Sequence, residues 1–316
     1  MAELKNNFSW SFSAAEDFDT CRRRRYWSKY GKWGGWAHDA SPEKRKAYQL
    51  DKMDNRYSLQ GNAVETAVMW ALREKQQGRD VTADQAYEQA ARPFLNGAYQ
   101  QSKSGAWDEN PKKNCCLHEH YYAALHGNAD DSWTATIMDN TKRCIVNFID
   151  RVLPRLANIT PDQEVRVVRP GDGGDPEHFV FEGVKIYAIP DYVYREGDTF
   201  HIIDWKSGKA KPAHHAQLAL YGFWATVKHA VPAEKITVYI EYLADGTTAA
   251  ETLTEDRLVD VRNTIGESVG DMAEYLVDAD GARNEALPID EWDLAPTRDP
   301  CQRCNFYELC APAFNE

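Results

Sequence analysis

Over much of the chain, hydrophobic residues recur among polar ones with the spacing of a helix. From Ser58 to Arg73, small and apolar residues return every three or four positions, which predicts an amphipathic helix. Similar spacing predicts helices over His214–Lys228 and Asp256–Val277. A helix with polar breaks is expected over residues 8–30, and mostly helical structure over residues 80–160. The first half of the chain is therefore expected to be largely helical.

After Pro161 the pattern changes to one that is typical of strands. Segments rich in β-branched and aromatic residues are separated there by Gly and Asp turns. The predicted strands are Val165–Val168, Phe179–Ile189, Tyr192–Tyr194, Phe200–Ile203 and Ile236–Tyr242. Strands with interposed and flanking helices predict an α/β fold with a helical covering.

One predicted hairpin brings two carboxylates together. Gly197-Asp198 separates two apolar runs, and this pair favours a two-residue turn. The resulting register places Asp191 directly opposite Asp204, with β-carbons about 5 Å apart on one face. Lys206 shares that face, because side chains two residues apart on a strand point the same way.

Two carboxylates this close repel each other unless a cation lies between them or one is protonated. Their hard oxygen ligands suit Mg²⁺ or Mn²⁺. A solvent-facing hairpin edge with ordinary charges explains these residues equally well. Two flanking features favour the metal site: Gln217 and Tyr221 lie on one face of the following helix, and Glu65 lies at the margin of an apolar helical stripe.

Composition and charge limit the classes of protein to which this chain can belong and the ways in which it could bind nucleic acid. The 316 residues are 43% hydrophobic and 27% charged, as in a soluble globular protein. Because the net charge is −12, a nucleic acid would have to be bound by a local basic patch or a metal. Candidate patches are Arg22, Arg23, Arg24, Lys209 and Lys211. With no secretory signal and no membrane-spanning apolar stretch, a cytoplasmic protein that binds no membrane is expected.

Seven cysteines in such a chain indicate metal ligands or free thiols rather than disulfides. Cys301, Cys304 and Cys310 are close enough in sequence to bind one metal centre, which needs a fourth ligand. Four cysteines suit a [4Fe–4S] cluster or Zn²⁺. A second group, Cys115 to His120, is interpreted as core and surface residues, because His118 and His120 on a helix would point about 200° apart. Cys144, in an apolar run, is expected to be a buried thiol.

Together these motifs resemble the PD-(D/E)XK nuclease superfamily, and within it the RecB-type nucleases. Pro190-Asp191 followed by Asp204-Trp-Lys206 matches the motif that names the superfamily, and Gln217-x-x-x-Tyr221 is similar to the RecB-type extension. The segment from Ser9 to Arg23 is similar to the N-terminal segment of the iron–sulfur members, which include CRISPR-adaptation nucleases and helicase–nucleases. In one departure, Glu65 stands where RecB-type nucleases usually carry histidine.

The resemblance implies a metal-dependent DNA nuclease, of exonuclease type, that hydrolyses phosphodiester bonds. Glu65, Asp191 and Asp204 would bind Mg²⁺ or Mn²⁺, and Lys206 would orient the attacking water. Gln217 and Tyr221 would support the metal and the DNA. Cys21 would complete the four ligands of a structural [4Fe–4S] cluster, with Zn²⁺ as the alternative.

The resemblance also implies a restriction-endonuclease-like fold, in which helices flank a mixed central sheet and the cluster staples the two chain ends. A single domain over residues 1–316 would contain four segments: an N-terminal segment with the first cluster cysteine (1–57), a helical insertion (80–160), the catalytic sheet core (161–245) and a cysteine-rich tail (296–316). Expected partners are DNA, single-stranded or at its ends, and a helicase or CRISPR-adaptation protein. Two alternatives are a non-catalytic nucleic-acid-binding subunit of such a complex and a cluster-bearing redox or regulatory protein.

Overall fold

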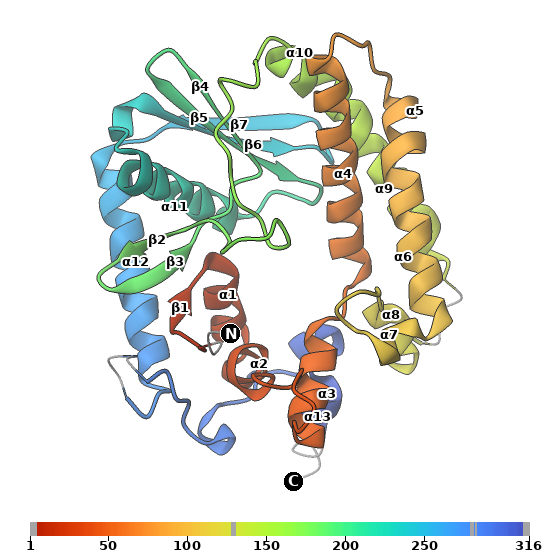
Figure 1. Cartoon of the computed structure of the whole chain (residues 1–316), viewed down its shortest axis with the longest axis vertical. Coiled ribbons are helices and arrows are strands. Elements are labelled where there is room, and N and C mark those ends of the chain that lie inside the picture. Colours follow the sequence, from red (N-terminus) through yellow and green to blue (C-terminus); the bar gives the residue numbers. More distant parts are fainter. Residues whose placement is uncertain (1–4, 128–130, 279–280, 282, 312–316) are drawn as a thin grey trace.

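The computed structural model describes residues 5–127, 131–278, 281 and 283–311 (Figure 1). The extremes of the predicted terminal segments, residues 1–4 and 312–316, lie outside the described residues, as do residues 128–130 of the predicted helical insertion.

A four-stranded mixed sheet forms the centre of the molecule, with strand order β4-β5-β6-β7. Its strands are β4 (Tyr192–Glu196), β5 (Thr199–Lys206), β6 (Ile236–Tyr242) and β7 (Thr247–Thr252). β4 and β5 form an antiparallel hairpin, β6 runs parallel to β5, and β7 returns antiparallel to β6. The parallel step requires a crossover, which helix α11 (Pro212–His229) supplies.

Helices cover both faces of this sheet (Figure 1). On one face α11 packs against the sheet with α12 (Glu255–Ala273) outside it, close to the predicted helices. On the other face lie α4 (Arg56–Gln76), which contains the predicted helix from Ser58 to Arg73, and α9 (Trp133–Asn147). Because strand side chains alternate, even-numbered residues of β5 face α11, whereas Ile203 and Trp205 face α4 and α9.

A second sheet of three strands, which was not expected, accompanies the mixed central sheet. Its order is β1-β3-β2, with β1 (Ser9–Trp10), β2 (His178–Phe181) and β3 (Val184–Tyr187). The predicted strand over residues 179–189 is two strands, because Glu182 and Gly183 both adopt positive φ and reverse the chain. Pro190, which has no N–H for a ladder, lies between β3 and β4.

Residues 80–160 are mostly helical, as predicted. A nearly continuous helical stretch runs through α5 and α6, and a second one through α9 and α10. The shorter helices of this region and its neighbours are α5 (Ala83–Ala86), α6 (Arg92–Ser104), α7 (Ala106–Glu109), α8 (His118–Tyr121) and α10 (Leu153–Leu156).

Two local predictions were wrong. Residues 8–30 do not form one helix: after β1 come α1 (Phe12–Thr20) and α2 (Arg22–Tyr26), and Cys21 between them is extended, with φ −165°. The predicted strand Val165–Val168 is instead a loop that touches β4 through one hydrogen bond, from Val165 N–H to the Val193 carbonyl at 2.9 Å.

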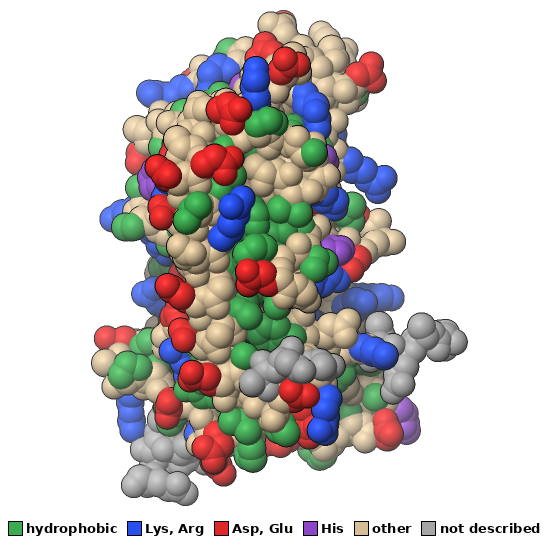
Figure 2. Space-filling model, turned by 90° about the vertical axis from the view of Figure 1, so that its left-hand side faces the viewer, with side chains coloured by type: hydrophobic (Ala, Val, Ile, Leu, Met, Phe, Trp, Pro, Cys, Tyr) green, Lys and Arg blue, Asp and Glu red, His purple; other side chains and the backbone are tan. Residues whose placement is uncertain are grey.

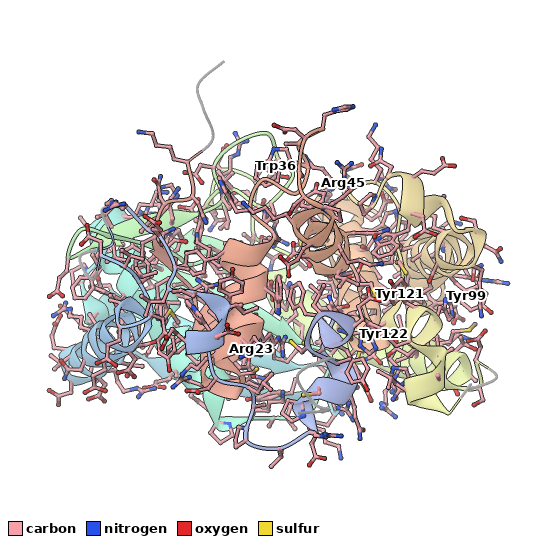
Figure 3. The ribbon with its side chains drawn as sticks, turned by 90° about the horizontal axis from the view of Figure 1, so that it is seen from below. Arg23, Trp36, Arg45, Tyr99, Tyr121 and Tyr122 are labelled. Carbon is pink, nitrogen blue, oxygen red and sulfur yellow. The ribbon has the colours of Figure 1, made fainter. Side chains whose placement is uncertain are left out.

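The C-terminal segment packs against the N-terminal helices and the mostly helical region of residues 80–160 (Figure 3). Helix α3 (Pro42–Asp51) and helix α13 (Tyr307–Cys310) lie in this part of the molecule. Arg23 Nε donates to the Trp292 carbonyl at 2.9 Å, and the Tyr122 hydroxyl donates to the Asn305 carbonyl at 2.9 Å. Side-chain hydrogen bonds therefore join the C-terminal segment to an N-terminal helix and to the region around α8.

Candidate active site

The β4–β5 hairpin has the predicted register, from Tyr192 opposite Ile203 to Glu196 opposite Thr199. Gly197 in the turn has φ 56°, a conformation that glycine adopts readily. Asp191, immediately before β4, therefore lies beside Asp204, and both line one cavity of about 320 Å³. The hairpin thus brings together the two carboxylates that the sequence pairs.

The walls of this cavity come from four parts of the chain. The second and third turns of α4 form one wall, the segment before β4 and the end of β5 form the floor, and α11 closes the far side. The lining residues are Gly61, Asn62, Val64, Glu65, Ile189, Asp191, Asp204, Trp205, Lys206, Ser207, Gln217 and Tyr221. All six residues predicted to take part in catalysis line this one cavity.

Burial makes the two aspartates a strong electrostatic pair. Asp204 is only 2% exposed, and this burial raises the pKa of its carboxyl while Lys206 opposes the rise. Burial, and then the charge of Asp204, raise the pKa of Asp191. The Trp205 N–H donates to Asp191 Oδ2 at 2.7 Å, which fixes the orientation of that carboxylate. Such a pair favours a bound cation, because a cation would relieve the repulsion that raises these pKa values.

The donor atoms of the cavity fit a hard divalent cation. Asp204 Oδ2 is buried and accepts no well-aligned hydrogen bond from the described residues, although Lys206 Nζ lies 2.6 Å from it. Carboxylate oxygens are the ligands that Mg²⁺ and Mn²⁺ prefer. As the side chains of the described residues stand, no three His, Cys, Asp or Glu residues are grouped closely enough to hold one ion. A third carboxylate would therefore have to move to complete such a site.

Lys206 is held in place by residues of α11. Its Nζ donates to Gln217 Oε1 at 2.8 Å, and Gln217 Nε2 donates to the Tyr221 hydroxyl at 2.8 Å. The Tyr221 hydroxyl in turn bonds to Asp204, so burial and both aspartates raise the pKa of Tyr221. The spacing of four residues places Gln217 and Tyr221 on the same face of α11. Hydrogen bonds through Gln217 and Tyr221, together with the ion pair to Asp204, therefore orient the lysine beside the aspartates.

Arg169 is a residue of this site that the sequence analysis missed. It comes from the loop between Val165 and Glu177, forms an ion pair with Glu65 of α4, and donates to the Asp191 carbonyl. A lone arginine in a loop has no periodic pattern that would connect it to residues about a hundred positions away. Glu65 thus lies at the cavity, but its carboxylate is bound by an arginine.

The four cysteines predicted to bind a cluster line a second small cavity. Cys21 enters it from the break between α1 and α2, and Cys301, Cys304 and Cys310 enter it from the C-terminal segment. Burial raises the pKa of the Cys304 thiol to about 12, and it also raises the pKa values of Cys301 and Cys310. Such thiols stay protonated unless a metal displaces the proton. The side chains as they stand form no metal-holding group within the part of the chain that is described.

The remaining cysteines lie elsewhere. Cys144 is fully buried, as predicted, and Cys116 is buried in the hydrophobic cluster that also contains Trp107 and Cys310. His118 and His120 make different contacts: His118 bonds to His126, and His120 bonds to the Ser102 hydroxyl.

The predicted basic patches differ in how their side chains are used. Arg22 lies over the Phe18 ring, Arg23 bonds to the Trp292 carbonyl, and Arg24 pairs with Asp17 at 2.8 Å. Lys209 and Lys211, by contrast, are exposed on the loop between β5 and α11, next to the cavity. On the face that carries α12, acidic and basic side chains are interspersed (Figure 2).

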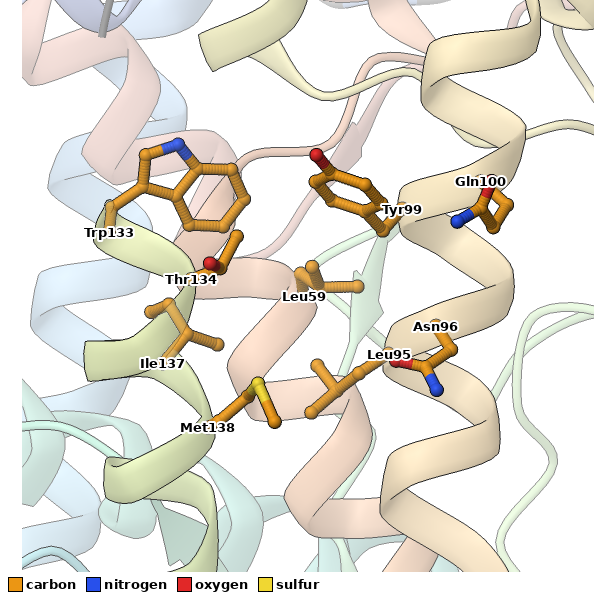
Figure 4. Close-up of a pocket in the computed structure, with 9 residues that line it drawn as sticks. All are labelled: Leu59, Leu95, Asn96, Tyr99, Gln100, Trp133, Thr134, Ile137 and Met138. Carbon is orange, nitrogen blue, oxygen red and sulfur yellow. The ribbon is translucent and has the colours of Figure 1, made fainter. Parts of the chain in front are cut away.

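An apolar cavity of about 270 Å³ lies apart from the aspartates, between α4, α6 and α9 (Figure 4). Its lining is Leu59, Leu95, Asn96, Tyr99, Gln100, Trp133, Thr134, Ile137 and Met138. None of these lining residues carries a carboxylate, amine, thiol or imidazole, so this cavity lacks the groups that hydrolysis needs.

Comparison with known proteins identifies the family. Residues 9–311 match the family model described as the PD-(D/E)XK nuclease superfamily. This range includes both sheets, the aspartate cavity and the four-cysteine cavity. No curated protein matches the chain. No helix within the described ranges is both long and apolar enough to cross a membrane.

Proposed function

Because this chain belongs to the PD-(D/E)XK nuclease superfamily, we propose that it is a metal-dependent deoxyribonuclease. Members of the superfamily are generally metal-dependent phosphodiesterases and typically use Mg²⁺. The observation that carries the proposal is the cavity in which Asp191 and Asp204 lie side by side next to Lys206. This arrangement supplies two anionic ligands and one cationic donor to the same small volume.

In this proposal Glu65, Asp191 and Asp204 hold Mg²⁺ or Mn²⁺. Such an ion lowers the pKa of its bound water and offsets negative charge on the phosphate. The Lys206 ammonium, fixed by Gln217, donates to the attacking water and stabilises the charge that develops on the phosphate. The Tyr221 hydroxyl holds both Gln217 and Asp204, so it keeps the lysine and the metal ligand in one geometry.

The substrate we propose is DNA, single-stranded or at its ends, which is digested as an exonuclease would digest it. Lys209 and Lys211 are exposed beside the cavity, and this supports a role in phosphate contact. Arg22, Arg23 and Arg24 are retained as weaker candidates, because each already contacts other parts of the chain. A helicase or CRISPR-adaptation protein remains the proposed partner.

We also propose that the chain is of the RecB-type iron–sulfur subtype, with a structural [4Fe–4S] cluster bound by Cys21, Cys301, Cys304 and Cys310. The lining of one small cavity by these four residues supports the proposal. Their thiol chemistry fits a cluster and also fits Zn²⁺. Quantification of iron, sulfide and zinc in anaerobically purified protein separates the two.

The nuclease proposal is tested with labelled single- and double-stranded DNA in Mg²⁺, in Mn²⁺ and in EDTA. We expect cleavage in the divalent metals that disappears in EDTA and in the Asp204→Asn variant. Binding of DNA without turnover in any divalent metal would instead favour a non-catalytic subunit.

A further inference from the structure

Arg169 lies on a loop whose backbone is fixed beside the aspartate cavity. The loop is attached to β4 by the hydrogen bond from Val165 N–H to the Val193 carbonyl at 2.9 Å. The Glu177 carboxylate accepts from Val168 N–H at 3.2 Å, and Glu177 N–H donates to the Val168 carbonyl at 2.8 Å. Glu177 is itself paired with Lys228 of α11. The Arg169 side chain therefore starts from a well-anchored position.

This side chain reaches from the loop to two residues that line the cavity, Glu65 of α4 and Asp191. It forms an ion pair with Glu65 and donates to the Asp191 carbonyl, so it contacts two residues proposed as metal ligands. The Arg169 side chain is 29% exposed and the Glu65 side chain 32%, so the pair is partly accessible to solvent. The guanidinium is neither buried in the core nor spread on the outer surface.

Electrostatics sets the Arg169 guanidinium and a bound metal ion in competition for the Glu65 carboxylate. Among the described residues, Lys206 pairs with the Asp204 carboxylate and Arg169 with the Glu65 carboxylate, and Arg169 also donates to the main-chain carbonyl of Asp191. A divalent cation that takes the Glu65 carboxylate weakens its pairing with the guanidinium, because two cations on one carboxylate repel each other. The guanidinium then needs another anion within reach of its anchored loop.

We propose that Arg169 alternates between two anions, an inference that rests on the proposed nuclease function. In the metal-free protein it holds Glu65, and when a divalent cation takes Glu65 it binds a phosphate of the DNA strand at the cavity. Arginine suits this exchange, because its planar fork fits a carboxylate and a phosphate with the same pair of N–H donors. Arg169 is then both a competitor of the metal and a substrate-positioning residue.

A purely structural role for Arg169 predicts a different effect of its loss on metal affinity. If the ion pair only joined the loop to α4, its loss would loosen the site and weaken metal binding. If Arg169 competes for Glu65, its loss frees the carboxylate and strengthens metal binding. The direction of the change in metal affinity therefore separates the two roles.

The experiment measures Mn²⁺ affinity of the DNA-free protein by titration calorimetry, for wild type, Arg169→Met and Arg169→Lys. Arg166→Met is the control, because Arg166 is an exposed residue of the same loop. We expect Arg169→Met to bind Mn²⁺ at least about fivefold more tightly, the lower end of typical coupling between two sites. Arg169→Lys should lie between wild type and Arg169→Met, and Arg166→Met should match wild type.

A double-variant cycle makes the result independent of folding differences. In the Glu65→Gln background, Arg169→Met should leave Mn²⁺ affinity unchanged, because the carboxylate for which they compete is gone. With DNA present, Arg169→Met should raise KM by about tenfold or more with a smaller change in kcat, as expected for the loss of a charged hydrogen bond to the substrate.

Weaker or unchanged Mn²⁺ binding by Arg169→Met would overturn the proposal, and so would an unchanged KM. The metal titration does not depend on turnover. If wild type cleaves DNA but Arg169→Met does not bind Mn²⁺ more tightly than wild type, the proposed role of Arg169 is wrong and the nuclease proposal stands. If wild type binds Mn²⁺ but cleaves nothing, the nuclease proposal falls, and the exchange of Glu65 between arginine and metal is still decided.

Discussion

Lys206 Nζ lies 2.6 Å from Oδ2 of Asp204, two residues earlier on the same face of β5. The strand alone produces this proximity, because side chains two residues apart point to the same side. The hydrogen bond from Lys206 to Gln217 prevents the amine from turning away. One strand and one helix thus position the lysine that we propose to be catalytic.

Removal of this amine should abolish most cleavage and leave the fold intact. We predict that Lys206→Met lowers kcat for DNA cleavage by about 10²- to 10³-fold, as for the loss of one donor to developing negative charge. Gel assays with end-labelled DNA measure the rate. Lys235→Met, an exposed lysine on the segment between α11 and β6, is the control. Equal rates for Lys206→Met and wild type would refute the role given to Lys206.

Gln217 should affect the rate of cleavage indirectly, because it holds Lys206 in place. We predict that Gln217→Leu lowers kcat by about 10- to 100-fold, the usual cost of losing a residue that orients a site group. Gln217→Glu should retain more activity, because it keeps an oxygen that accepts from Lys206. The KM for DNA should change little in both variants. A larger effect on KM than on kcat would show that Gln217 binds substrate directly.

Stability of the metal-free protein should fall as the pH rises from about 4 to about 7. Burial and the neighbouring Asp204 raise the pKa of Asp191 to about 7. The folded state then binds more protons than the unfolded state between those pH values, so deprotonation costs stability. Asp191→Asn should flatten this slope and be more stable than wild type at pH 8 by roughly 1–3 kcal/mol.

Urea unfolding in EDTA at pH 5, 6, 7 and 8 measures this dependence. The control is Asp139→Asn, an exposed aspartate on α9, which should keep the wild-type slope. Addition of Mn²⁺ should remove most of the fall between pH 5 and pH 8 in wild type. A stability that rises over this range in EDTA would show that the Asp191 proton is not favoured by the fold.

The cysteine cavity predicts a metal that stabilises the junction of the two chain ends. We expect Cys304→Ser to lose bound iron and to unfold with about 2–3 kcal/mol less stability, the contribution of a ligand at roughly a hundred times its Kd. Cys115→Ser, outside that cavity, should keep the metal and the wild-type stability. Metal analysis and urea unfolding of the same samples provide both readouts. Full metal content in Cys304→Ser would exclude this cysteine as a ligand.

Sequence predicted the parts of the site that local periodicity determines. The Gly197-Asp198 turn and the alternation of strand side chains specify the hairpin register, and this register is found. The spacing of Gln217 and Tyr221 specifies one helical face, and α11 presents both residues to the cavity. The chemical roles of these residues stay predictions, because the geometry alone does not test them.

Other features depend on contacts between distant segments, which no local pattern encodes. Arg169 reaches Glu65 across about a hundred residues of chain, so nothing in its own neighbourhood indicated the pairing. The division into two sheets depends on the reversal at Glu182 and Gly183, inside a run that looks like one strand. The break at Cys21 likewise interrupts a segment whose composition favours a helix.

We propose that Asp191 and Asp204 hold a divalent cation between them. Diffraction from crystals soaked in Mn²⁺, at a wavelength where manganese scatters anomalously, tests this claim most directly. We predict an anomalous peak about 2.0–2.3 Å from a carboxylate oxygen of each aspartate, with Lys206 Nζ alongside. A peak bound by only one of the two aspartates, or no peak in this cavity at saturating Mn²⁺, would contradict it.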